Sequence, residues 1–145
     1  MSARTLTETQ FLSLAEFRYQ MRRFLHFSER ESRAFGLQPQ HYQLLVAIKG
    51  LPPSKDPTVG VLAERMQLEH HSLVELLDRA SHQGLVSRKR DAGDRRRVGI
   101  HLTAKGERLV EELASRHIAE LQTSGRRLMA ALDPLLRSRH ARLRA

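Results

Sequence analysis

The 145-residue sequence contains no cysteine. Disulfides, cysteine–zinc sites and thiol-based redox sensing are therefore excluded, and a reducing cytosol suits the chain. No segment approaches the ~18 continuous apolar residues that cross a bilayer. Residues 1–10 are polar and lack the apolar core of a signal peptide. We therefore expect a cytoplasmic protein with no membrane partner.

Acidic residues are also scarce relative to basic ones. The sequence has 16 Asp and Glu and 25 Lys and Arg, which gives a formal net charge of +9 at pH 7. Such an excess favours nucleic acid or an anionic membrane surface as a partner. A basic but inert surface is the alternative, and whole-chain charge does not exclude it. The length suits one domain with a real core.

Apolar residues recur mostly at helical spacing, with stop signals between the segments. Phe17, Met21, Phe24 and Leu25 form one stripe, and Gly36 ends that helix. Thr58 is a good N-cap for a later helix, and Gly84 a good C-terminal cap. The predicted helices cover residues 8–34, 39–48, 59–66 and 70–83, and two more follow residue 103.

The segment between these helical groups is strongly basic. Six of the ten residues in 88–97 are cationic, with Asp-Ala-Gly-Asp at the centre. Val98, Ile100 and Leu102 then alternate with other residues, which predicts a two-stranded hairpin over 85–102. Its tip carries three arginines that repel one another unless an anionic partner, such as a phosphate backbone, neutralises them.

The C-terminal region begins at Thr103 and has two apolar faces. Leu109 and Leu113 lie on one face, whereas Val110 and Ile118 lie on the other. A helix that is apolar on two faces needs more neighbours than one small domain offers, which points to a partner subunit. We expect Gly125 to interrupt this helix and Pro134 to kink or begin the next one.

Two short helices followed by a basic hairpin form a winged helix-turn-helix. Leu85-Val86, Arg88, Asp94-Arg95-Arg96 and Leu102-Thr103 with Gly106 resemble the wing and exit signature of the MarR family of bacterial transcriptional regulators. Asp78-Arg79 resembles the end of that family's recognition helix. The resemblance covers nearly the whole chain.

The resemblance implies a mainly α fold with a small β-hairpin wing and long terminal dimerisation helices. It gives one MarR-like domain, residues 1–145. The predicted parts are dimerisation helices at 8–35 and 104–145 and a winged-helix lobe at 39–102, which contains the helix-turn-helix at 58–83 and the wing at 85–102.

The second helix of the pair is predicted to enter the major groove of DNA. Its candidate contacts lie opposite the apolar stripe or near the helix end. They are Glu69, His70, His71, Ser72, Val74, Glu75 and Arg79. Glu75 stands where relatives often carry a basic or polar residue, and it can accept only from base amino groups.

At the wing, the resemblance places Arg96 as the minor-groove arginine, with Arg95 and Arg97 beside it. A guanidinium suits a narrow, strongly negative groove. Asp94 resembles the wing aspartate that orients an arginine, and its partner stays open among Arg79, Arg88 and Arg95.

Relatives often bind small phenolic or anionic effectors between the dimer helices and the DNA-reading part. In this chain that crevice would have apolar walls with a few cations. The candidates are Phe17, Arg18, Met21, His41, Tyr42 and Leu45, for which simple core packing is an equal alternative.

The eight histidines do not form a recognised metal motif, although His26 and His41 could meet if the first two helices pack together. We expect no metal site, no cofactor and no catalysis. The predicted function is a ligand-responsive, homodimeric repressor that binds a palindromic double-stranded DNA site. The alternatives are a winged-helix module that organises DNA without sequence preference or binds protein or RNA, and a metal-responsive regulator.

Overall fold

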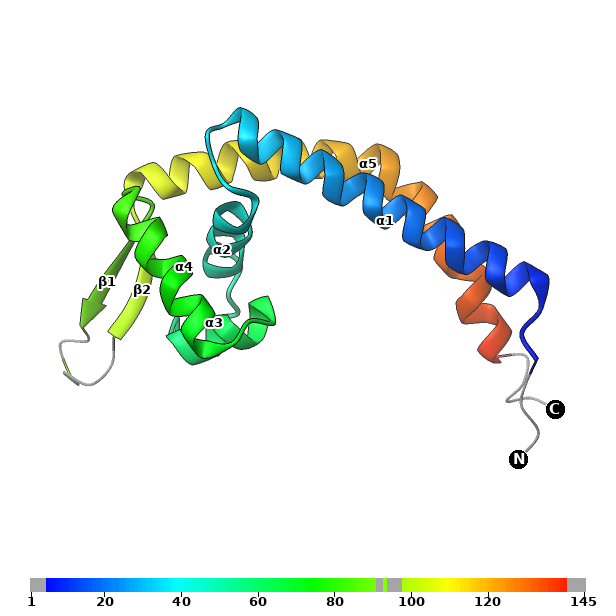
Figure 1. Cartoon of the computed structure of the whole chain (residues 1–145), viewed down its shortest axis with the longest axis horizontal. Helices are drawn as coiled ribbons and strands as arrows, with labels where there is room; N and C mark the ends of the chain where they lie inside the picture. The colour runs from blue at the N-terminus through cyan, green and yellow to red at the C-terminus, as the bar shows by residue number, and fades with distance from the viewer. Residues whose placement is uncertain (1–4, 91–92, 94–97, 141–145) are drawn as a thin grey trace. The chain divides into compact units, whose positions relative to one another are not determined.

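A computed structural model describes residues 5–90, 93 and 98–140 of the chain. Figure 1 shows the elements of these residues in chain order. They are α1 (Glu8–Ala34), α2 (Pro39–Lys49), α3 (Val59–Met66), α4 (His70–His82), β1 (Val86–Arg90), β2 (Val98–Leu102) and α5 (Ala104–His140). The predicted order of four helices followed by a hairpin is confirmed.

The chain divides into two compact units. One combines α1 up to Arg30 with α5 from Arg116, and the other spans Glu31–Ser115. The second unit is wider than the predicted lobe at 39–102. The reason is packing, because Val110 and Leu113 from the first turns of α5 are buried in the same apolar core as α2 and α4.

The core of the second unit is built from the predicted apolar stripes. The stripe of α4 is fully buried, and it consists of Leu73, Leu76, Leu77 and Ala80. Leu44 and Leu45 of α2 and Leu62 of α3 pack with it. Because each buried leucine contributes about 1.5–3 kcal/mol, this shared core fixes the exposed face of α4.

Local capping groups fix where the helices of this unit begin and end. The Thr58 hydroxyl accepts a hydrogen bond from the Val61 N–H at 3.3 Å, as predicted for the N-cap of α3. Gly84 has φ +69°, and the Leu85 N–H reaches back to the Ala80 carbonyl at 3.0 Å. This left-handed turn ends α4 and sends the chain directly into β1.

The two strands form an antiparallel hairpin in which Val86 pairs with Leu102 and Arg90 with Val98. Ile100 is buried, and its N–H donates to the Pro57 carbonyl at 2.8 Å. The base of the hairpin is thereby anchored to the loop before α3. Figure 1 shows β1 and β2 side by side.

Helix α5 corrects two predictions about the C-terminal region. It continues without a break through Gly125 and Pro134. A helical glycine costs only about 1 kcal/mol relative to alanine, so the apolar contacts of the helix can outweigh it. Proline removes one N–H donor, and the helix nevertheless continues to His140. A separate last helix was therefore a wrong prediction.

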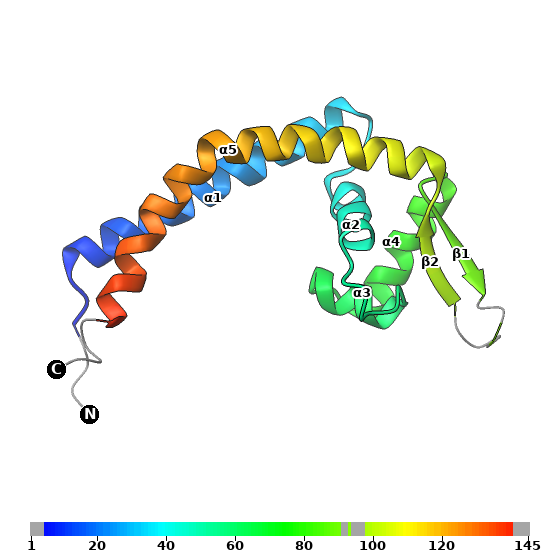
Figure 2. The ribbon, with the colours of Figure 1, turned by 180° about the vertical axis from the view of Figure 1, so that it is seen from behind.

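In the first unit, α1 and α5 lie side by side in both Figure 1 and Figure 2. His117 of α5 is buried and its Nε2 lies 2.8 Å from the Ser28 hydroxyl of α1. The rings of Phe24 and Phe27 meet the His117 ring edge-on, with centroids at 5.9 and 5.5 Å. One imidazole thus joins the two helices. Among the described residues, no helix is both long enough and apolar enough to span a bilayer.

Candidate nucleic-acid interface

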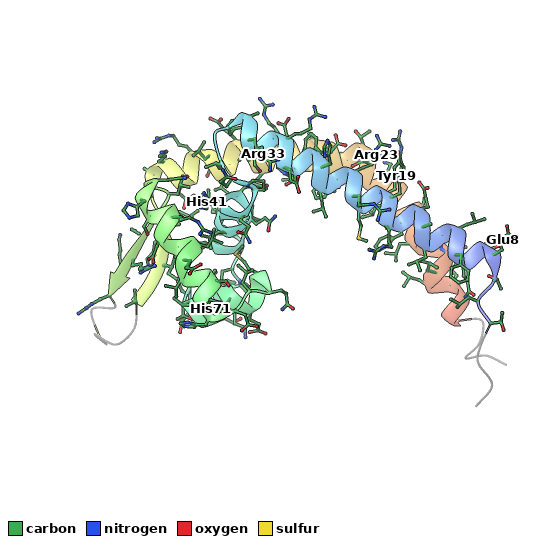
Figure 3. The ribbon with its side chains drawn as sticks, in the orientation of Figure 1. Glu8, Tyr19, Arg23, Arg33, His41 and His71 are labelled. Carbon is green, nitrogen blue, oxygen red and sulfur yellow. The ribbon has the colours of Figure 1, made fainter. Side chains whose placement is uncertain are left out.

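The exposed face of α4 carries most of the predicted DNA-reading side chains. Glu69, His70, His71 and Glu75 are exposed around the helix start, and Arg79 is exposed near its end. Ser72 and Val74 are half-buried, so they offer less surface to a partner. Figure 3 shows His71 at the start of α4. Two imidazoles and two carboxylates therefore surround a helix N-terminus, where free backbone N–H groups favour an anion.

An ion pair joins α4 to the hairpin. Nη2 of Arg88 in β1 lies 2.6 Å from Oδ1 of Asp78 in α4. Both side chains are substantially exposed, so the pair contributes only ~1 kcal/mol or less to stability. Its geometric effect is larger, because it links the end of the predicted recognition helix to the first strand of the wing.

The described part of the wing is cationic on its outer surface. Arg88, Lys89 and Arg90 are all exposed on β1, whereas Val86 at the base is buried. The four wing-tip residues predicted from the sequence, Asp94, Arg95, Arg96 and Arg97, lie outside the described residues. Their predicted roles, and the partner of Asp94, stay predictions.

The predicted effector residues divide between the two units. Tyr42 and Leu45 belong to the apolar core of the second unit, and His41 is 2% exposed there. Phe17 and Met21 are half-buried and Arg18 is exposed in the first unit. Core packing accounts for Tyr42 and Leu45, and the proposed crevice stays a prediction.

His41 is a buried polar group beneath α4. Burial lowers its pKa below the usual value, and the nearby Arg79 guanidinium lowers it further. Gln83 is close enough to act in the opposite direction, yet neither ring nitrogen makes a well-formed hydrogen bond within the described chain. The neutral form of the His41 imidazole is therefore favoured. Arg79 is exposed to solvent and is also close enough to His41 to lower its pKa.

A metal site needs several converging ligands. Within residues 5–90, 93 and 98–140, no group of three or more His, Asp or Glu side chains is placed to hold an ion. His26 lies in the first unit and His41 in the second.

Sequence reasoning missed two features of the site. The first is the contact of Arg88 with Asp78, which are ten residues apart across the end of α4. The second is the outward display of Lys89 and Arg90 beside it. The basic run signalled the hairpin cations, but no sequence periodicity pairs a helix with the strand that follows it.

Together, the helix pair α3–α4 and the hairpin define a winged helix-turn-helix protein. The MarR family model matches residues 35–97 of this chain, which covers α2, α3, α4 and β1 and ends just before β2. The resemblance predicted from the sequence is thereby confirmed for residues 35–97.

The chain is also similar to a regulator of known sequence. The uncharacterized HTH-type transcriptional regulator YsmB of Bacillus subtilis (strain 168) is 37% identical over 71 residues, which are 49% of this chain and 49% of YsmB. The chain thus matches about half the length of that relative.

Two solved structures share the fold over nearly all of their length. AbsC, a MarR family transcriptional regulator from Streptomyces coelicolor, is similar with a TM-score of 0.72 and 24% identity, over 98% of this chain and 99% of AbsC. The MepR–DNA complex from S. aureus gives a TM-score of 0.64 and 22% identity, over 84% of this chain and 92% of MepR.

Proposed function

We propose that this chain is a homodimeric transcriptional regulator of the cytoplasm that binds a specific double-stranded DNA site and acts as a ligand-responsive repressor. The observation that carries the proposal is the exposed face of α4, which Asp78 joins to the cationic strand β1, within the segment that the MarR family model matches. The DNA-bound MepR structure supports this use of the fold. No catalytic role is assigned to any residue.

The proposed division of labour follows the chemistry of the two elements. The start of α4 reads base edges in the major groove through Glu69, His70, His71 and Glu75, with smaller contributions from Ser72 and Val74. Arg79, Arg88 and the wing arginines contact phosphate or the adjoining minor groove. Asp94 orients one of these arginines.

Homodimer formation is supported by the surface of the first unit. Large apolar side chains are exposed along both of its helices, including Phe11 at 56%, Leu25 at 53% and Ile118 at 57%. Exposed apolar clusters of this kind mark interaction surfaces. Two copies joined here would present two α4 helices to two half-sites.

The decisive test is the ratio of affinities for the regulated promoter and for a random duplex at one salt concentration. A sequence-specific regulator binds its site about a thousandfold or more tightly than random duplex. Genome-wide footprinting of the native protein supplies the promoter sequence. Equal affinity for both duplexes would contradict a sequence-specific regulator and would favour a protein that organises DNA without sequence preference.

Arg96→Ala is expected to weaken specific DNA binding by about 1–3 kcal/mol without changing the thermal stability. The reason is the loss of the guanidinium that the MarR resemblance places in the minor groove. Arg126→Ala, which removes an equal charge from α5 in the other unit, is the control. Titration of both variants against labelled promoter DNA measures the difference. Equal losses of affinity for the two variants would mean that Arg96 contributes only through the net charge of the protein.

Asp78→Asn is expected to weaken specific DNA binding by up to about fivefold, the equivalent of ~1 kcal/mol for an exposed pair. The sign is informative, because the substitution makes the protein more positive and simple charge attraction would strengthen binding. Asp133→Asn is the matched control, since Asp133 forms an exposed ion pair with Arg137 at 2.6 Å in α5. Tighter binding by Asp78→Asn would show that its link to Arg88 does not position the wing.

A further inference from the structure

A basic groove separate from the DNA-reading face lies between α1 and α5 of the first unit. Its volume is about 410 Å³, which is in the range of small-molecule sites. Figure 3 labels two of its residues, Tyr19 and Arg23, on neighbouring turns of α1. The groove is lined by Tyr19, Arg22, Arg23, His26, Phe27, Arg30, Glu120 and Ser124.

The charge of the lining points to a dianion. Arg22, Arg23 and Arg30 bring three guanidinium groups, against the single carboxylate of Glu120. Three guanidinium groups and one carboxylate give these side chains an excess of two positive charges. A phosphate monoester carries about −1.5 to −2 at pH 7 and presents three acceptor oxygens, whereas a monocarboxylate carries −1. Arginine forks suit phosphate geometry.

The groove also offers flat surfaces. The Tyr19 side chain is 49% exposed, and the Arg23 guanidinium carbon lies 5.8 Å from the Tyr19 ring centroid. Phe27 adds a second ring to the lining. Aromatic rings and guanidinium planes together form the surface on which a nucleobase stacks. The Glu120 carboxylate is an acceptor for sugar hydroxyl or base amino groups.

The groove and the exposed apolar surface occupy different faces of α1. Tyr19, Arg22, Arg23, His26 and Arg30 recur at helical spacing and form one face, whereas Phe11, Leu14 and Leu25 are centred on a neighbouring face and Leu12 lies two turns before Tyr19 on the side of the groove. The apolar residues are exposed as well.

We propose that this groove binds a nucleoside monophosphate, with Arg22 and Arg30 on the phosphate and Tyr19 against the base. Arg23, held over the Tyr19 ring, completes the stacking surface. The proposal does not depend on the function assigned to α4 and the wing, because every lining residue belongs to α1 or α5 of the first unit.

Calorimetric titration of the full chain with adenosine 5′-monophosphate tests the site. We expect saturable binding of one nucleotide per chain, with affinity at least tenfold above that for adenosine, inorganic phosphate or benzoate. The double variant Arg22→Gln/Arg30→Gln should lose at least tenfold in affinity, and Tyr19→Ala should lose severalfold. Arg126→Gln/Arg127→Gln, an equal loss of two positive charges at exposed positions of the same unit outside the groove, should bind as the native chain does.

Three results would overturn the proposal. Absence of saturable nucleotide binding would do so, as would benzoate binding equal to that of the nucleotide. The third is a loss of nucleotide binding in Arg96→Ala that matches the loss in the groove variant, since this would place the phosphate on the DNA-binding surface. Circular dichroism of each variant confirms that the fold is intact.

Discussion

Replacing Gly106 with alanine is expected to destabilise the chain by about 3 kcal/mol. Gly106 lies in the first turn of α5, and a Cβ built there would lie 2.2 Å from the Leu85 carbonyl oxygen. That carbonyl cannot move freely, because it accepts a hydrogen bond from the Thr103 N–H at 3.1 Å. The Thr103 hydroxyl in turn accepts from the Gly106 N–H and donates to the Gly84 carbonyl. The added methyl group must therefore push α5 away from the end of α4.

Gly60→Ala is the matched control for this prediction. Gly60 is also helical, in α3, and a Cβ there meets nothing within 4 Å. Alanine should stabilise that helix by up to about 1 kcal/mol, because it lowers the entropy cost of ordering the backbone. Urea unfolding of both variants measures the two effects. Equal stability changes would mean that the close approach of Gly106 to Leu85 is not a constraint.

The fold of the second unit could be predicted largely from local signals. The Thr58 cap, the positive-φ glycine at 84 and the apolar stripe of α4 each act within a few residues, so the sequence displays them directly. Helix α5 was harder to predict. Gly125 and Pro134 are local stop signals, and the helix that continues through them packs against α1, which is distant in the sequence.

The candidate site divides in the same way. The exposed start of α4 followed from the periodicity of its buried stripe. The contact between Arg88 and Asp78 did not, because it depends on how the strand leaves the helix. The groove of the first unit was also missed, since Arg22 and Arg30 read as an ordinary solvated helix face until Glu120 and Ser124 are brought opposite them.

Ile118→Glu is expected to convert the chain from a dimer to a monomer. Ile118 is 57% exposed on α5, with Leu121 at 40% and Met129 at 71% on the same helix. A carboxylate at the centre of an apolar contact between two copies would lose its hydration without a partner. Light scattering measures the change in mass. Thr123→Glu, an equal charge change at an exposed polar position of α5, should remain dimeric.

The Ile118→Glu variant should also lose at least about a hundredfold in affinity for promoter DNA, although it changes no residue of α4 or the wing. Two linked recognition helices bind the second half-site at high effective concentration, and a monomer forfeits that gain, which amounts to about 10²–10⁴ in affinity. Binding to a single half-site should change little, because each lobe keeps its own contacts. If the Ile118→Glu chain is monomeric but keeps full promoter affinity, dimer formation is not needed for DNA binding. If the Ile118→Glu chain is still a dimer, this apolar surface is not the dimer interface.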